Sequence, residues 1–344
     1  MERILIGSDS EVLIDRGLPV PLLPERANRQ ASAVFHQPAT AGLAVKIADA
    51  TGIRSPKRCL PDRDGAKSLD AIAAAYGWLA DENLARHDTI IGVGGGAVTD
   101  ASGYLAATWM RGIESVLVPT TLLGAVDAAI GGKTAINVGA SVPGVGKNLV
   151  GAFWNPTRVV VDLDVLEANP PALILEGTAE ILKAGLLGDG AIVDAYTVHG
   201  IDAPLDFLVP RAIAVKAAVV GLDPRESGRR AILNFGHTVG HGIEAVTGMP
   251  HGYAVAIGMV AEAALSARRY GFDFEWFSAL VFSLGLPVAE AGVSAAAVST
   301  WMERDKKRSA EGTVMALLRA VGDPVVETVS TEEIAYALGV VGAV

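Results

Sequence analysis

The sequence contains a single cysteine, Cys59, among its 344 residues. One cysteine cannot form an internal disulfide, and without a Cys-x-x-Cys partner it predicts neither a zinc site nor dithiol redox chemistry. No apolar run approaches the roughly 18–20 residues that a membrane-spanning helix needs. Residues Met1 to Leu5 also lack the basic start and long apolar stretch of a signal peptide. We therefore expect a globular, cytoplasmic protein with no membrane partner.

Positive charge is also scarce, because the formal net charge is −10 and only nine lysines accompany 19 arginines. This balance argues against a nucleic-acid partner, which needs a positive surface, and favours small molecules. Most of the lysines fall inside the motifs described below. They are Lys67, Lys133, Lys147, Lys183, Lys216, Lys306 and Lys307. A compact ammonium group commonly binds phosphate or carboxylate, so these lysines predict an anionic ligand.

Hydrophobic residues make up 51% of the chain, which is enough for the cores of two domains. The first half alternates apolar runs with helical stretches, which predicts a mostly parallel sheet covered by helices. The expected strands contain residues 4–6, 33–35, 89–93, 115–118 and 158–162. After about Pro170 long stretches with helical spacing dominate, at 172–187, 209–222, 239–247 and 254–270. Because Pro170 and Pro171 interrupt regular structure, we expect an α/β domain over 1–169 and a mainly α-helical domain over 170–344.

A glycine cluster, Gly94-Gly95-Gly96, follows the apolar run that begins at Thr89. A strand that runs through glycines into a helix can bind a pyrophosphate on the helix N-terminus. The spacing from Gly92 to Ala97 fits a dinucleotide fingerprint, but no convincing acidic residue ends a second strand about 20 residues later. The cluster alone therefore leaves cofactor binding and an ordinary tight turn equally open.

A second glycine-rich region carries Asp127, Lys133, Lys147 and Asn148, whose side chains could converge on a polyoxygenated anion. Gly131-Gly-Lys-Thr134 resembles the end of a Walker A loop. The earlier glycine of that motif is absent, because Val126 and Asp127 occupy its place. We therefore exclude a P-loop ATPase.

Three of the six histidines lie within fifteen positions, at His237, His241 and His251. Imidazole is the commonest metal ligand, and His237 and His241 share one face of a predicted helix. Spacing alone nominates both as ligands, with either His251 or Glu180 completing the site. Glu180 and Lys183 also share a helix face, and their small, apolar neighbours indicate a buried functional pair.

Taken together, these motifs resemble one family, 3-dehydroquinate synthase, among the sugar phosphate cyclases. The matching blocks occur in the family's order and cover nearly the whole chain. They are Gly94-Gly-Gly with Asp100, Trp109-Met-Arg-Gly112, Val118 to Leu123, Asp127 to Thr134, Gly146 to Phe153, Glu180 to Lys183, Arg225 to Arg230, Asn234 to His241, His251-Gly252 and Asp305-Lys-Lys307.

The resemblance implies an α/β domain and a helical domain that together use NAD and a divalent metal, usually zinc, with cobalt as an alternative. It places the metal on Glu180, His237 and His251, and gives His241 to the substrate instead. The implied NAD-binding residues are Asp64, Lys67, Gly94, Gly95, Gly96, Asp100, Thr120, Thr121, Asp127, Lys133 and Lys147.

The implied substrate is 3-deoxy-arabino-heptulosonate 7-phosphate, which a homodimeric lyase would convert to 3-dehydroquinate and phosphate in the shikimate pathway. Transient oxidation by NAD, phosphate elimination, reduction and intramolecular aldol closure are the implied steps. Asp127, Glu180, Lys183 and His241 are the implied catalytic residues. The implied substrate-binding residues are Arg111, which would come from a neighbouring subunit, with Lys133, Asn148, Lys216, Arg230, Asn234 and either Lys306 or Lys307.

Two features depart from the family pattern. Residues 138–145 form an extension that affects the expected reach of Lys147 and Asn148, and Tyr253 stands where the family often has glutamate. The alternatives are a cyclase of secondary metabolism, of the aminodehydroquinate or inosose type, and a metal-dependent polyol phosphate dehydrogenase. The carboxylate-binding set with Arg230 argues against both, because a buried arginine would lack its partner.

Overall fold

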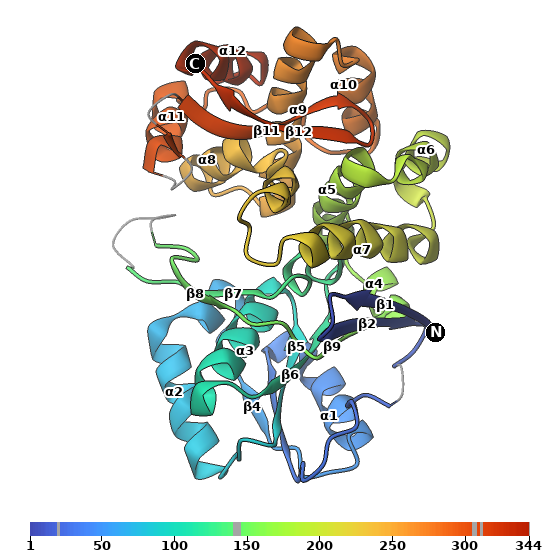
Figure 1. The fold of residues 1–344 in the computed structure, drawn as a ribbon, viewed down its shortest axis with the longest axis vertical. Coiled ribbons are helices and arrows are strands. Elements are labelled where there is room, and N and C mark those ends of the chain that lie inside the picture. Colours follow the sequence, from blue (N-terminus) through green and yellow to red (C-terminus); the bar gives the residue numbers. More distant parts are fainter. Residues whose placement is uncertain (19–20, 140–145, 305–307, 310–311, 344) are drawn as a thin grey trace. The chain divides into compact units, whose positions relative to one another are not determined.

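The computed structural model describes residues 1–18, 21–139, 146–304, 308–309 and 312–343. The chain divides into two compact units, Met1–Pro170 and Pro171–Val344. Figure 1 shows a sheet with helices in the first unit and a largely helical second unit. This confirms the predicted fold class.

The first unit is built on a seven-stranded sheet in the order β1-β2-β9-β6-β5-β3-β4. Strand β1 pairs antiparallel with β2, and the other neighbours are parallel. The strands are β1 (Glu2–Ile6), β2 (Ser10–Asp15), β3 (Ser32–His36), β4 (Lys57–Cys59), β5 (Thr89–Gly94), β6 (Glu114–Pro119) and β9 (Arg158–Asp162). All five apolar runs predicted as strands are present. The short β4 ends at Cys59, whose side chain is exposed.

Helices cover both faces of this sheet, which explains why its strands are almost continuously apolar. Successive residues of β3 point to opposite faces: Ala33 and Phe35 enter one core, and Val34 enters the other. The first core is closed by α2 (Leu69–Asp81) and α3 (Gly96–Thr108), and the second by α1 (Ala41–Ala50). A short helix α4 (Leu163–Glu167) follows β9.

Parallel strands place their carboxyl ends at one edge of the sheet. In the β5–β6 pair, Gly94 lies opposite Pro119. The glycine cluster after β5 and the threonines after β6 therefore start from neighbouring positions. A hairpin that the sequence analysis did not predict, β7 (Lys133–Ile136) with β8 (Val150–Phe153), carries Lys133 as its first residue.

The second unit contains eight α-helices among its described residues. They are α5 (Pro171–Gly188), α6 (Gly190–His199), α7 (Leu205–Leu222), α8 (His237–Thr247), α9 (His251–Tyr270), α10 (Phe274–Ser283), α11 (Ala295–Arg304) and α12 (Thr331–Val340). The four predicted helical stretches lie inside α5, α7, α8 and α9. Among these residues and those of the first unit, no helix combines the length and apolarity that crossing a membrane requires.

Helix α9 is the centre of this unit, and its residues from Ala254 to Ser266 are buried. Small residues let its neighbours approach closely. A Cβ added at Gly258 would lie 1.9 Å from the carbonyl oxygen of Gly236, just before α8. A Cβ at Gly252 would lie 2.4 Å from the carbonyl oxygen of Glu176 in α5. The start of α8 therefore lies against the middle of α9, and the first turn of α9 lies against α5; the starts of α8 and α9 carry the histidines.

An antiparallel sheet, β10-β11-β12, completes the second unit. Its strands are β10 (Arg308–Ser309), β11 (Gly312–Ala320) and β12 (Asp323–Val329). The buried Ser266 of α9 accepts a hydrogen bond from the backbone N–H of Leu318 at 2.9 Å, which joins β11 to the central helix. The mainly helical prediction for this half did not include these strands.

Candidate active site

The buried ion pair of Glu180 and Lys183 lies on α5. Their side chains are 2% and 5% exposed, and Lys183 Nζ is 2.5 Å from Glu180 Oε2. A surface pair of this spacing would contribute little, whereas a buried pair carries a large desolvation cost. The pair is therefore buried, as the sequence predicted.

The three histidines come together from the starts of α8 and α9. Helix α8 begins at His237 because Gly236 adopts a left-handed conformation, with φ of 80°, and donates its N–H to Glu262 Oε2 at 2.7 Å. Potential ligand atoms of His237, His241 and His251 lie within 4.8 Å of one another. The turn before α8 thus fixes one imidazole beside two others.

Glu180 faces two of these imidazoles. Its Oε1 is 3.5 Å from His237 Nε2 and 3.7 Å from His251 Nε2, while its Oε2 is held by Lys183. One carboxylate oxygen and two imidazole nitrogens therefore converge within a buried region of the second unit. The structure brings together all four residues that the sequence nominated for the metal, so both predicted ligand sets remain available.

Glu244 is a candidate site residue that the sequence analysis missed. Its Oε2 is 2.9 Å from His251 Nδ1, and this contact turns the opposite nitrogen, Nε2, towards Glu180. Metal-bound histidines usually have such a partner on the second ring nitrogen. The sequence could have predicted this position, because Glu244 follows His237 by seven residues and His241 by three, which places it on the same helix face.

The electrostatic surroundings push the two imidazoles in opposite directions. Burial, together with the positive charge of Lys183, holds the pKa of His237 well below its usual value. Burial also acts to lower the pKa of His251, but its contacts with Glu180 and Glu244 outweigh this and raise it to about 10. His237 is thus neutral and ready to act as a ligand at neutral pH, whereas His251 must lose a proton to bind a metal.

This donor set fits a divalent metal. A carboxylate and two imidazoles are ligands that zinc and cobalt accept, and three protein ligands leave coordination positions for substrate oxygens. Glu180, His237 and His251 would hold the ion. The assignment of His241 to the substrate rather than to the metal stays a prediction.

The predicted substrate-binding residues of the second unit lie around the same helices. Arg230 is 2% exposed and donates from Nη1 to the carbonyl oxygen of Pro224 at 2.7 Å. Asn234 donates from Nδ2 to Glu226 Oε1 at 2.8 Å. Lys216 is half-buried on α7. Lys306 and Lys307 lie outside the described residues.

In the first unit the glycine cluster forms the start of α3. Gly95 is the residue before the helix, and a Cβ there would lie 3.2 Å from Thr121 Cγ2. Gly94 is buried at the end of β5, whereas Gly95 and Gly96 are partly exposed and carry no side chains at the N-terminus of α3, where a pyrophosphate binds well. These residues therefore fit a dinucleotide.

Beside this turn, the buried Lys67 joins two other predicted site residues. Its Nζ is 2.5 Å from Asp100 Oδ2 and also contacts the side-chain oxygen of Asn148. Asp64 and Lys147 form a more exposed pair at 3.3 Å. Asn148, predicted to contact the substrate phosphate, thus lies among residues predicted to bind NAD.

The other predicted residues of the first unit are placed by turns. The N–H of Thr120 donates to the carbonyl oxygen of Gly94 at 3.0 Å, and Thr121 Oγ1 accepts from Gly124 N–H at 3.0 Å. Asp127 lies in a π-helical turn, Gly124–Ala128. Lys133 is exposed on β7, and Arg111 is exposed with φ of 66°.

The two departures from the family pattern have local consequences. Residues 140–145 of the extension lie outside the described residues. The segments on either side are joined, because Val138 N–H donates to Gly146 O at 2.9 Å and Asn148 N–H donates to Asn137 Oδ1 at 3.1 Å. Tyr253 is half-buried in the first turn of α9, and Glu244 instead accepts the hydrogen bond of His251 Nδ1.

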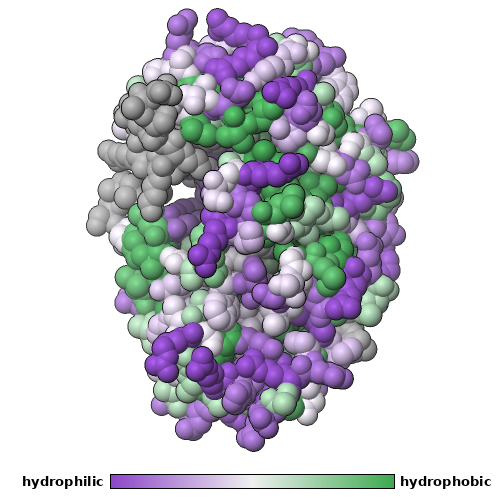
Figure 2. Space-filling view, in the orientation of Figure 1, coloured by the Kyte–Doolittle hydropathy of each residue, from purple (hydrophilic) through white to green (hydrophobic). Residues whose placement is uncertain are grey.

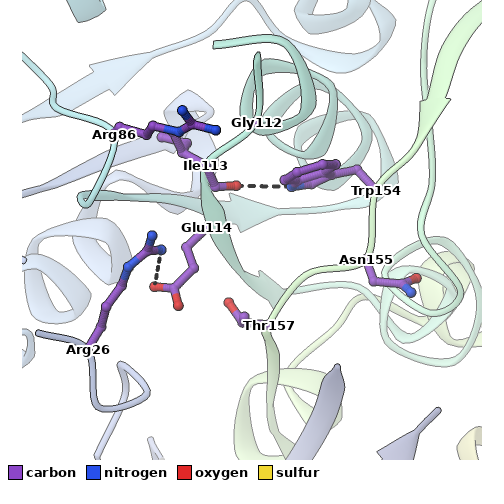
Figure 3. Close-up of a pocket in the computed structure, with 8 residues that line it drawn as sticks. All are labelled: Arg26, Arg86, Gly112, Ile113, Glu114, Trp154, Asn155 and Thr157. Carbon is purple, nitrogen blue, oxygen red and sulfur yellow. Dashed lines mark hydrogen bonds and ion pairs between the residues drawn. The ribbon is translucent and has the colours of Figure 1, made fainter. Parts of the chain in front are cut away.

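A pocket of about 280 Å³ lies at the opposite, amino-terminal edge of the first unit's sheet. Figure 3 shows Arg26 directed towards Glu114, at 3.3 Å, and the indole N–H of Trp154 directed towards the carbonyl oxygen of Ile113, at 3.0 Å. Glu114 begins β6, whereas the glycine cluster follows the end of β5. None of the predicted site residues lines this pocket.

Comparison with known proteins agrees with this arrangement. The family model for the 3-dehydroquinate synthase N-terminal region matches residues 57–176, and the model for the C-terminal region matches residues 177–308. The 3-dehydroquinate synthase of Corynebacterium jeikeium (strain K411) is 41% identical over 347 residues, which is 94% of this chain and 91% of that protein.

Two solved structures share the fold. A 2-deoxy-scyllo-inosose synthase complexed with carbaglucose-6-phosphate, NAD+ and Co2+ has a TM-score of 0.82 at 24% identity and covers 98% of each chain. The 2-epi-5-epi-valiolone synthase of Streptomyces hygroscopicus subsp. jinggangensis 5008, with NAD+ and Zn2+ bound, has a TM-score of 0.84 at 22% identity, again over 98% of each chain. At these identities the structures show the fold. The two family models and the identity to its relatives show that the chain belongs to the 3-dehydroquinate synthase family.

Proposed function

We propose that this chain is a 3-dehydroquinate synthase of the shikimate pathway, a lyase that converts 3-deoxy-arabino-heptulosonate 7-phosphate to 3-dehydroquinate and phosphate. The observation that carries the proposal is the convergence of His237 Nε2 and His251 Nε2 on one oxygen of Glu180, whose other oxygen contacts Lys183. In a member of this family, such a set predicts a catalytic metal beside a buried ammonium group.

Glu180, His237 and His251 would hold zinc or cobalt, the metals named for the two structural neighbours. When bound, the metal acts as a Lewis acid that polarises hydroxyl and carbonyl oxygens of the substrate. Glu244 keeps the Nδ1 side of His251 engaged, so that Nε2 is the ligand atom. Lys183, buried beside Glu180, can donate hydrogen bonds to substrate hydroxyls.

In the first unit, Gly94, Gly95 and Gly96 would receive the NAD pyrophosphate, with Asp64, Lys67, Asp100, Thr120, Thr121, Asp127, Lys133 and Lys147 around the rest of the cofactor. When bound, NAD would supply reversible hydride exchange with the C5 alcohol, so none would be consumed. Lys67 is already oriented by Asp100, which supports its assignment to this site.

The anionic ends of the substrate need cationic partners. Lys216 and Arg230 would bind the carboxylate. The phosphate would contact Lys133, Asn148, Asn234, His241 and Lys306 or Lys307, with Arg111 from a second subunit. The substrate's own phosphate can take the proton during elimination, so no side chain has to act as that base. Asp127, with Glu180 and Lys183, would order the hydroxyl groups.

We infer a cytoplasmic homodimer. Three large hydrophobic residues of the first unit, Met110, Leu149 and Phe153, are 44%, 58% and 51% exposed. Met110 and Phe153 belong to neighbouring segments, because Gly112 packs against Trp154. Figure 2 shows hydrophobic residues gathered in patches between hydrophilic ones on the face that it draws. Such patches often mark protein interfaces. Sedimentation of the purified protein tests the dimer.

The decisive experiment measures phosphate release from 3-deoxy-arabino-heptulosonate 7-phosphate with catalytic NAD, before and after chelation, while NADH absorbance is followed. We expect release that the chelator stops and that added zinc restores, with no net NADH. Glu275→Gln, which changes an exposed carboxylate on α10, is a control that should behave like the wild type.

Two results would contradict the proposal. If NADH accumulates in proportion to product, the protein is a dehydrogenase. If the metal-loaded protein releases no phosphate from this substrate but does so from a sugar phosphate without a carboxylate, it is a cyclase of the secondary-metabolism type.

A further inference from the structure

The turn between α7 and the short 3-10 helix η6 (Arg229–Asn234) is organised around one carboxylate, that of Asp223. Its Oδ1 accepts hydrogen bonds from Ser227 N–H at 2.8 Å and Ser227 Oγ at 2.9 Å. Its Oδ2 accepts from Gly228 N–H at 2.8 Å and Arg230 N–H at 3.1 Å. Both oxygens of this buried side chain are therefore used to shape the turn.

This turn fixes Arg230 at two points. Asp223 holds its backbone N–H, and the carbonyl oxygen of Pro224, the next residue after Asp223, accepts from its guanidinium at 2.7 Å. The side chain of Arg230 thus folds back onto the turn that Asp223 closes. If the turn opens, the backbone and the guanidinium of Arg230 both lose these two contacts.

The same turn sets Glu226, which adopts a left-handed conformation with φ of 56°. Such a conformation is unfavourable for glutamate and persists only where its surroundings impose it. Here the hydrogen bonds of Asp223 to Ser227 and Gly228 close the turn directly after Glu226. The carboxylate of Glu226 can then accept from Asn234 at 2.8 Å.

Asp223 stays charged in this setting, because the backbone N–H groups of Ser227 and Arg230 lower its pKa well below the usual range. A charged carboxylate with four donors is a rigid support. Replacement by asparagine would keep the size but put an N–H₂ group where an acceptor is needed. The N–H groups on that side of the turn would lose their acceptor and would face another donor.

We propose that Asp223 is a positioning residue that sets substrate specificity, because it fixes the turn that presents Arg230 to a carboxylate of the substrate. The inference rests on the proposed function, in which Arg230 binds that carboxylate. The side-chain hydrogen bonds of Asp223 to the described residues stay within residues 223–230, away from the histidines and Glu180. Its role is therefore separable from metal binding.

The experiment compares Asp223→Asn with the matched control Asp273→Asn. Asp273 also accepts a backbone hydrogen bond, from Trp276 N–H at 3.0 Å, but it caps α10. For each protein, KM and kcat are measured with the substrate. Calorimetry then gives the Kd of two non-reactive phosphate analogues, one with the carboxylate and one with a hydroxymethyl group in its place.

For Asp223→Asn we expect KM, and the Kd of the carboxylate analogue, to rise roughly 10- to 100-fold, as a misplaced binding group does. The Kd of the hydroxymethyl analogue and the Kd of zinc should stay within about threefold of wild type. The control Asp273→Asn should match the wild type in KM, in the Kd of each analogue and in the Kd of zinc. Ser227→Ala removes one of the four donors. It should also weaken the binding of the carboxylate analogue more than that of the hydroxymethyl analogue, by a smaller factor, and it replaces Asp223→Asn in the experiment if that variant does not fold.

Equal losses for both analogues, or no loss for either, would overturn the inference and leave Asp223 as a purely structural residue. Failure of the proposed function gives a different pattern: the wild type would release no phosphate. The two analogues would then still report whether Asp223 controls carboxylate binding, because their binding requires no turnover.

Discussion

Glu244 holds one side of His251, and this single contact leads to a prediction about metal affinity. Glu244→Gln keeps the size of the side chain but removes the charge that fixes the imidazole. We expect the Kd for zinc to rise about 10- to 100-fold, the usual effect of losing such a partner. Competition with a chromophoric chelator measures it, and Glu275→Gln is the exposed control. An unchanged Kd would show that Glu244 does not support the ligand.

His251→Ala tests the ligand assignment itself. Because it removes one of three predicted ligands while the buried part of α9 remains, we expect loss of stoichiometric zinc and of turnover with an unchanged circular dichroism spectrum. Metal analysis of the purified variant gives the answer. Full activity in metal-free buffer would contradict the assignment.

Single residues also show what the sequence could and could not predict. Helical spacing predicted that His237 and His241 lie together, and the family resemblance added Glu180 and His251, which lie on two other helices. The contact of Asn148 with Lys67 was not, since 81 residues separate the two and a long-range pairing leaves no periodic signal. The helical spacing of Glu244 could have placed it beside the histidines, but no sequence motif around it drew attention to it.

At the level of elements, the packing of α8 against α9 depends on Gly258. An added Cβ would lie 1.9 Å from Gly236 O and 2.7 Å from Gly240 N, so Gly258→Ala must push the helices apart. We expect the free energy of unfolding to fall by about 1–3 kcal/mol or more, and the zinc Kd to rise, because Gly236 precedes His237. Chemical denaturation of the metal-free protein measures the first effect.

Gly339→Ala in α12 is the matched control, since no atom lies within 4 Å of its added Cβ. It should leave stability unchanged or raise it by about 0.4–1 kcal/mol, through the lower entropy of the unfolded chain. If both substitutions have the same effect, the close approach of α8 and α9 is not what makes Gly258 necessary.

The start of α12 predicts a pH dependence. Ser330 and Glu333 form a capping box, and Arg269 contacts Glu333 at 2.7 Å. The hydrogen bond from Arg269 is the main reason why the pKa of Glu333 falls from its ordinary 4.5 to about 2. A depressed carboxylate pKa stabilises the fold above pH 4.5, and this contribution is lost as the pH falls towards 2.

The comparison with Glu333→Gln isolates this effect. In metal-free protein, the wild type should be more stable than the variant above pH 5, and the difference should shrink between about pH 4.5 and 2. Thermal unfolding at several pH values measures it. A difference that stays constant over this range would show that the charge of Glu333 does not contribute.

Elements with strong patterns were predicted, and weakly patterned ones were not. The runs that became β5 and β9 are buried on both faces, so their apolar character is continuous. In contrast, β11 contains Met315, Ala316, Leu317 and Leu318, residues that also suit a helix. It is a strand because it pairs with β12 and packs on α9, and such tertiary context is not local in the sequence.

For the whole molecule, the predicted cofactor residues divide between the two units, and this can be tested. Lys67→Ala should raise the Kd of NAD at least about tenfold, because it removes the ammonium that Asp100 orients, and should leave the Kd of zinc within about threefold. Glu180→Gln should do the reverse. Fluorescence titration for NAD and chelator competition for zinc, on the full chain, measure both. Equal effects on both ligands would show that the sites are coupled.

The change in sequence character near Pro170 predicted two parts, and the chain does form two compact units, Met1–Pro170 and Pro171–Val344. The assignment of NAD to the first and the metal to the second stays a prediction. Sequence could not supply the second unit's small sheet or the hairpin β7–β8, because both depend on pairings between segments. The placing of the few lysines inside the motifs did predict the chemical class of the ligand, an anion.

Cys59 ends β4 with an exposed side chain and has no competitor elsewhere in the sequence. A maleimide dye will therefore label the first unit at one defined position without any prior mutagenesis. One substitution in the second unit, Val198→Cys at a residue that is 73% exposed, would supply the other attachment point. Energy transfer between the two dyes would then report, molecule by molecule, whether adding NAD, zinc or an inhibitor changes the spacing between the two halves.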